Sequence, residues 1–232
     1  MPFGFFFDPR YLLFALPAMA LVLFAQWRVQ SAYARYSQVR NAYGLTGAEA
    51  ARRLLDWAGL GHIPVHVVPG NLSDNYDPRA KVLNLSQGVA ETPSVASLGI
   101  AAHEIGHALQ DAQAYVPLRA RAAIVPAANL GSSLGFMIFF LGLFFHPLAW
   151  VGIGLFSIAV LFTLITLPVE LNASRRARTL LSSSGLASPT EMEGVSAVLN
   201  AAALTYVAAL AQALATLLYF LDVMGVFSDR RR

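Results

Sequence analysis

The sequence contains no cysteine and few charged residues. Without cysteine, disulfide bonds, thiolate metal ligands and cysteine nucleophiles are all excluded. Charged residues make up only 12% of the chain and hydrophobic residues 56%, whereas about a quarter of a soluble domain is charged. Because so few charges cannot coat a water-exposed surface, the composition predicts that lipid covers part of the protein.

Lysine is almost absent as well: Lys81 is the only one, and arginine supplies the rest of the positive charge behind the net charge of +3. A nucleic-acid partner would require a clustered basic face with aromatic residues between the charges. The arginines instead flank apolar runs, as charges do at a membrane boundary. We therefore expect no nucleic-acid partner.

Four apolar segments are predicted to cross a lipid bilayer: residues 11–27, 127–145, 150–167 and 201–221. At about 1.5 Å of rise per residue, the second and third segments are each long enough for about 30 Å of hydrocarbon. Asp8 and Pro9 ahead of the first segment have the pattern of an N-cap followed by proline at the first helical position. Arg28, Arg35 and Arg40 follow this segment, so it is predicted to be a retained anchor rather than a cleavable signal peptide.

The second and third segments are separated by only a short connection, residues 146–149, which predicts an antiparallel helical hairpin. Gly131 and Gly135 in its first helix have the four-residue spacing that lets membrane helices approach closely. The alternative is that glycine is simply common in such helices.

The polar part of the chain, residues 29–125, predicts a small α+β unit. Thr46 and Glu49 have the spacing of a capping box, which predicts a helix to about residue 58. Residues 63–68 and 81–85 have the composition or alternation of strands, and a turn-rich connection lies between them. Thr92 is predicted to cap a further helix that continues to about residue 112.

This last helix carries the strongest functional signal, because His103, Glu104 and His107 form an HExxH pattern. Helical residues four apart share a face, so both imidazoles can bind one metal ion. Glu104 is close enough to reach a water held by that ion. The alternative is a pair of structural histidines on a buried helix.

A catalytic zinc usually has three protein ligands, so a third must come from elsewhere in the fold. Glu170 is the candidate, because a carboxylate at the end of an apolar segment is costly unless it is paired or bound to metal. The alternative is that Glu170 pairs with Arg175 or Arg178.

The remaining histidines are poorer candidates. His62 and His66 are also four apart, but they lie in a strand-like segment and are interpreted as structural. His146 belongs to the short connection on the opposite side of the membrane.

Three stretches of this sequence resemble a known family: His103–His107, Leu167–Ala177 and Asp74–Pro78. They are similar to the bacterial membrane zinc metallopeptidases of the YugP type and, more distantly, to the membrane gluzincins related to HtpX and the CAAX prenyl protease. The resemblance covers the chain from about Tyr33 to Tyr219. The family usually has histidine where this chain has Asn75.

The resemblance implies a mainly α membrane protein with about four transmembrane helices and a small α+β, gluzincin-like zinc peptidase domain at the membrane surface. It implies one Zn²⁺ per chain, bound by His103, His107 and Glu170, with Glu104 catalytic. Glu104 would take a proton from the zinc-bound water and pass it to the leaving amine. By analogy with related zinc peptidases, strand 81–85 could pair with an extended substrate.

Other residues are candidates for supporting roles. Ser174, one turn after Glu170, is a candidate hydrogen-bond partner of the ligating groups. Tyr206, Arg175 and Arg178 are candidates to stabilise the oxyanion. Packing between helices is the alternative role for Tyr206.

The chain is accordingly divided into five parts. These are an N-terminal anchor (1–28), the polar α+β segment with the HExxH helix (29–125), the membrane hairpin (126–168), a helix with the third zinc ligand (169–187) and a C-terminal helix with the fourth span (188–232). The fourth part is expected to be a short polar helix that starts after Pro168 and ends in a serine-rich loop, 182–185. Ser188 and Glu191 form a second capping box at the start of the fifth.

The orientation follows from the placement of arginine and lysine. Twelve of the sixteen lie between the first and second segments or between the third and fourth, and such charges favour the cytoplasmic side. Arg10 and Arg230–Arg232 lie elsewhere. The prediction is a multi-pass protein of the bacterial inner membrane with a cytoplasmic active site.

The favoured function is a zinc-dependent endopeptidase that cleaves membrane-associated polypeptides. The alternative is a non-catalytic, zinc-stabilised membrane protein that acts as an assembly or quality-control partner. An intramembrane protease of the site-2 type is disfavoured by Gln110, Asp111 and Gln113, which follow the metal motif. The sequence leaves open whether the chain forms a homo-oligomer or binds a membrane partner protein.

Overall fold

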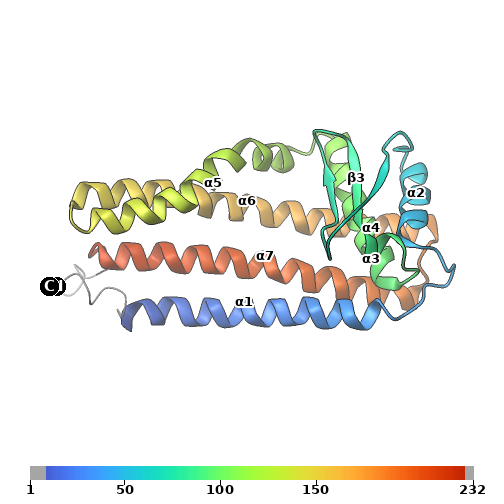
Figure 1. Cartoon of the computed structure of the whole chain (residues 1–232), viewed down its shortest axis with the longest axis horizontal. Coiled ribbons are helices and arrows are strands. Elements are labelled where there is room, and N and C mark those ends of the chain that lie inside the picture. Colours follow the sequence, from blue (N-terminus) through green and yellow to red (C-terminus); the bar gives the residue numbers. More distant parts are fainter. Residues whose placement is uncertain (1–8, 228–232) are drawn as a thin grey trace. The chain divides into compact units, whose positions relative to one another are not determined.

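The computed structural model describes residues 9–227, so Asp8 of the predicted N-cap and Arg230–Arg232 lie outside the described residues. The helices are α1 (Pro9–Tyr36), α2 (Gly47–Trp57), α3 (Gln87–Ala90), α4 (Val95–Ala112), α5 (Val116–Gly142), α6 (His146–Ser184) and α7 (Pro189–Val223). The strands are β1 (Val65–Val68), β2 (Asn75–Asp77) and β3 (Val82–Ser86) (Figure 1).

The described residues form two compact units. The helical unit comprises those within Met1–Ala25, Ala120–Leu167 and Thr205–Arg232, and the mixed unit comprises Gln26–Arg119 and Pro168–Leu204. Four helices of the described chain are long and apolar enough to cross a membrane, namely Arg10–Tyr36, Val116–Gly142, His146–Ser184 and Pro189–Val223. The predicted class is confirmed: the protein is mainly α, with four candidate membrane spans and a small sheet.

In the helical unit, α5 and α6 lie side by side as the predicted hairpin (Figure 1). A Cβ at Gly131 would lie 2.5 Å from the carbonyl oxygen of Leu155, and one at Gly135 would lie 2.6 Å from the amide nitrogen of Phe156. The two glycines therefore permit backbone-to-backbone contact, which is one of the two interpretations that the sequence left open.

The mixed unit contains a three-stranded sheet with the order β1-β3-β2. β3 pairs with β1 in parallel and with β2 antiparallel, so both of its edges are occupied. The prediction that residues 81–85 pair with a substrate strand is therefore wrong. β2 was expected to be part of a turn-rich connection, but it forms a strand whose Tyr76 is buried in register with Leu83.

Local capping signals position the helices of this unit. The capping box of Thr46 and Glu49 is present at the start of α2, and the Glu191 amide donates to Ser188 Oγ at 3.3 Å at the start of α7. α4 begins two residues later than predicted, because Ser94 rather than Thr92 is its N-cap and accepts from the Ser97 amide at 3.0 Å.

The main departure from the predicted elements is the length of α6. The sequence predicted a break at Pro168 and a serine-rich loop at 182–185, but α6 continues through Pro168 to Ser184. Proline removes only one backbone donor, and membrane helices tolerate it. The serine hydroxyls of Ser183 and Ser184 donate to carbonyls one turn earlier, so the helix persists until Gly185, whose φ is +68°.

Candidate metal centre

The side chains of His103 and His107 lie on one face of α4 and meet Glu170 of α6. Glu170 Oε2 is 3.2 Å from His103 Nε2 and 3.4 Å from His107 Nε2. The two imidazole rings are 4.9 Å apart and nearly perpendicular. All three side chains belong to the mixed unit, and each offers a ligand atom within 4.8 Å of the other two.

A glycine inside the HExxH pattern permits this meeting. A Cβ at Gly106 would lie 2.5 Å from the carbonyl oxygen of Ala173, so α4 and α6 touch through their backbones at this point. Glu170 is about one turn before Ala173 on α6, which brings its short carboxylate arm within reach of both histidines.

The donor set fits a zinc ion. Zinc binds histidine nitrogen and carboxylate oxygen at about 2.0–2.2 Å in a tetrahedral arrangement, so neighbouring ligand atoms lie roughly 3.3–3.6 Å apart. The separations of 3.2 and 3.4 Å around Glu170 Oε2 are close to that range. Three protein ligands also leave one tetrahedral position open.

Gln110 fixes which nitrogen of His107 faces the ligand cluster. Its side-chain amide is fully buried and donates through Nε2 to the carbonyl oxygen of Val169 at 2.8 Å and to Asn172 Oδ1 at 3.0 Å. Its Oε1 therefore lies against His107 Nδ1, at 3.0 Å, and can only accept. Nδ1 must carry the proton, so Nε2 is the nitrogen whose lone pair can bind a metal.

Ser174, a candidate partner of the ligating groups, lies against a histidine of the cluster. Its Oγ is 3.1 Å from His103 Nδ1. Both histidines thus have a hydrogen-bonded partner on the nitrogen that faces away from Glu170, which orients the rings. The role of Gln110 was missed, although its position three residues after His107 on the same helix was the available signal.

Glu104 is buried next to the cluster and is held by a strand. Its Oε2 accepts a hydrogen bond of 3.0 Å from the backbone N–H of Tyr76 in β2. The Tyr76 hydroxyl donates to Asp111 Oδ2 at 2.8 Å, and Lys81 Nζ bonds to the same oxygen. Burial, and then the bond to Asp111, raise the pKa of Tyr76. The sequence did not indicate this arrangement.

The other predicted residues have different surroundings. Arg178 donates to Asn200 Oδ1 at 3.3 Å, and Arg175 is exposed. Tyr206 belongs to the helical unit, so its oxyanion role stays a prediction. His62 and His66 are exposed. Within residues 9–227, the cluster of two histidines and Glu170 is the only group of three found close enough to hold a metal ion.

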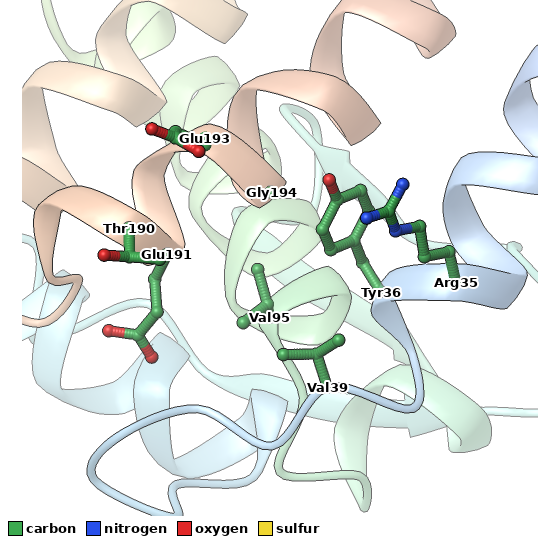
Figure 2. A pocket seen from close by; sticks show the side chains of 8 residues that line it. All are labelled: Arg35, Tyr36, Val39, Val95, Thr190, Glu191, Glu193 and Gly194. Carbon is green, nitrogen blue, oxygen red and sulfur yellow. The ribbon is translucent and has the colours of Figure 1, made fainter.

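A separate pocket of about 210 Å³ lies in the mixed unit (Figure 2). Its lining includes none of the residues just described. It is formed by Arg35, Tyr36, Val39, Val95, Thr190, Glu191, Glu193 and Gly194.

A possible metal site of two histidines and a buried glutamate, in a chain with four membrane-length apolar helices, is the arrangement expected of a membrane metalloprotein. The chain belongs to the family described as "Putative neutral zinc metallopeptidase", which matches residues 11–225. It is 44% identical over 215 residues to a Bacillus subtilis (strain 168) protein named "Putative membrane protease YugP", covering 92% of this chain and 96% of that relative. No solved structure matches the chain.

The resemblance predicted from the three sequence stretches is therefore confirmed at the level of the family. Membership of this family implies zinc as the metal, and the three clustered side chains are a possible site for it. The protein is an integral membrane protein of a zinc metallopeptidase family.

Proposed function

We propose that this protein is a membrane-embedded zinc endopeptidase of the gluzincin type. The observation that carries the proposal is the convergence of Glu170 Oε2 on both HExxH histidines, at 3.2 and 3.4 Å. The family assignment supports the same conclusion independently. Membrane-associated polypeptides are the proposed substrates, since the relative with 44% identity is named a membrane protease.

His103, His107 and Glu170 would hold the zinc, with Gln110 and Ser174 orienting the two imidazoles. Zinc in such a site acidifies a water molecule and polarises the carbonyl of the peptide to be cleaved. Glu104 is the proposed general base: its carboxylate takes the proton of the attacking water and returns it to the leaving amine nitrogen. Peptide hydrolysis then balances: the water oxygen bonds to the carbonyl carbon, the C–N bond breaks, and the proton of the water goes to the leaving amine nitrogen.

The oxyanion of the reaction needs a further donor. Arg175 and Arg178 stay candidates, together with Tyr206. Of the two arginines, Arg175 is the better one, because it is exposed whereas Arg178 is bonded to Asn200.

The arginine distribution supports a cytoplasmic active site in a bacterial inner membrane. Twelve positive residues lie between the first and second or between the third and fourth of the apolar segments 11–27, 127–145, 150–167 and 201–221. In a four-span protein these residues would share one side of the membrane. That same side carries His103, His107 and Glu170.

The second candidate function is a non-catalytic membrane protein stabilised by zinc. It is favoured by one observation, namely that the cluster joins two helices, α4 and α6, so that a bound ion would tie them together. In that case Glu104 would have no role beyond stability.

The substitution Glu104→Gln separates the two functions. We expect the variant to retain one zinc per chain, because Glu104 is not among the three ligands, and to lose cleavage of a casein-type or membrane substrate by at least about 100-fold. Zinc is measured by metal analysis and cleavage by gel or mass spectrometry. Cleavage at the wild-type rate would exclude the peptidase mechanism.

A further inference from the structure

The N–H that holds Glu104 comes from an edge strand. β2 pairs with β3 on one side only, and the backbone N–H of Tyr76 donates to Glu104 Oε2 at 3.0 Å. One carboxylate oxygen of Glu104, Oε2, is thereby engaged. The position of β2 relative to α4 therefore sets the direction of the Glu104 carboxylate.

The position of β2 is in turn set by a second contact with the same helix. Asp111 is about two turns after Glu104 on α4, and its Oδ2 accepts from the Tyr76 hydroxyl at 2.8 Å. Tyr76 is only 8% exposed, and this bond is partly buried. Tyr76 thus bonds to α4 at two points, through its amide to Glu104 and through its hydroxyl to Asp111.

Hydrogen bonds within the turn between β2 and β3 help to fix the position of β2. Asp77 Oδ1 accepts from the amides of Arg79 and Ala80 at 2.8 and 3.1 Å, which shapes the turn. Lys81 follows with φ at +56°, in the left-handed region that side chains rarely adopt. Its Nζ bonds to Asp111, but the Lys81 side chain is 55% exposed, so the Tyr76 hydroxyl is the stronger link.

We propose that Tyr76 and Asp111 are positioning residues for the general base. Asp111 holds the Tyr76 ring, the ring holds β2, and the Tyr76 amide orients the Glu104 carboxylate so that Oε1 faces the water and the leaving amine. The expected change in kcat rests on the proposed peptidase function. The hydrogen bond from the Tyr76 amide to Glu104 does not, because it is present without metal.

The kinetic experiment uses the full-length zinc-loaded protein in detergent or membranes. A displacement of about 1 Å can cost a catalytic step on the order of 100-fold, and a loosened strand moves less, so we expect kcat to fall about tenfold in Tyr76→Phe and in Asp111→Ala. KM and zinc content should stay unchanged. Asp111→Asn should recover most of kcat, because its amide oxygen still accepts from the Tyr76 hydroxyl.

The matched control is Asn75→Ala in the same pair of strands. It removes two exposed hydrogen bonds of 3.0 Å, one from Asn84 Nδ2 to Asn75 Oδ1 and one from Asn75 Nδ2 to the Ser73 carbonyl oxygen. It should leave kcat unchanged. A merely structural role of Tyr76 and Asp111 would instead lower the melting temperature without lowering kcat of the folded enzyme, and that result would overturn the proposal. An equal loss in Asp111→Asn and Asp111→Ala would overturn it as well.

A second measurement does not depend on peptidase activity. In the metal-free protein, Glu104→Ala removes the acceptor of the Tyr76 amide, so hydrogen exchange at that amide should become about tenfold faster. Glu193→Ala, an exposed glutamate of α7, should not change it. If hydrogen exchange at the Tyr76 amide is unchanged in Glu104→Ala, the amide does not hold the Glu104 carboxylate and the proposal is overturned. Faster exchange in a protein that cleaves nothing supports the hold and refutes the proposed function instead.

Discussion

At the scale of single residues, the metal centre depends on side chains that supply no ligand atom. Gln110 is fully buried and connects His107 to the backbone of α6. Such partners fix ring orientation and tautomer, and their loss typically weakens metal binding by about 10–100-fold.

We therefore expect Gln110→Leu to weaken zinc binding by about 10–100-fold, with the folded structure retained. The dissociation constant is measured by competition with a chromophoric chelator. Gln113→Leu is the control, because Gln113 accepts a hydrogen bond from Arg176 but contacts neither histidine in the described bonds. Equal zinc affinity in Gln110→Leu and wild type would contradict the tautomer assignment.

Gly106 is the residue with the least steric freedom at the site. Gly106→Ala would place a Cβ 2.5 Å from the Ala173 carbonyl oxygen, and overpacking of this kind costs about 1–3 kcal/mol. We expect a lower unfolding temperature and weaker zinc binding, because α4 and α6 must separate. Gly154→Ala is the comparison: its Cβ meets nothing within 4 Å, so that change should be neutral or slightly stabilising.

At the scale of elements, α2 is a helix whose start was predicted correctly from a local signal. Its capping box was predicted from Thr46 and Glu49 and is present. The bonds from the backbone amide of Thr46, then from its side chain, lower the pKa of Glu49. A carboxyl group with a lowered folded-state pKa stabilises the fold above its ordinary pKa, and that contribution is lost as the pH falls through the lowered value.

We therefore expect Thr46→Ala to cost about 1 kcal/mol of stability near neutral pH. Glu49→Gln should remove part of the stability loss that the wild type shows on acidification below the ordinary pKa of glutamate. Both are measured by denaturation at several pH values. If the stability of Glu49→Gln falls as steeply with decreasing pH as that of the wild type, the capping box does not contribute to the pH dependence.

α6 shows the opposite case, an element that local signals described wrongly. Pro168 and the serines at 182–184 are ordinary signals for a helix end, yet the helix passes through both. Val169, Ala173 and Ala177 are fully buried, so packing along this stretch outweighs the single lost backbone bond. The continuous helix is also what holds Glu170 and Ser174 in one register.

At the scale of the whole molecule, the absence of cysteine makes the membrane topology directly testable. Arg79 is exposed in the hairpin of the mixed unit and His146 is exposed at the start of α6. In intact cells, Arg79→Cys should resist a membrane-impermeant thiol reagent and react only after lysis, whereas His146→Cys should react before lysis. The cysteine-free wild type gives the background. The reverse pattern would place the active site outside the cytoplasm.

The sequence by itself determined the class of this protein. Four membrane-length segments follow from composition and length, and two histidines on one helix face follow from helical periodicity, since both depend only on neighbouring residues. Glu170 was identified because an unpaired carboxylate at the end of an apolar segment is costly, and the structure brings it to both histidines.

Only the tertiary structure decided what surrounds these residues. The bond from Gln110 to Val169 joins positions 59 residues apart, and the bond from the Tyr76 amide to Glu104 joins positions 28 apart. Every residue except proline has a backbone N–H, so the identity of a residue does not indicate which N–H will bond to Glu104. A glutamine likewise has the same local preferences whether its partner is water or a buried histidine. Which of these groups meet is settled by the packing of α4 against α6 and β2, and no local pattern encodes that packing.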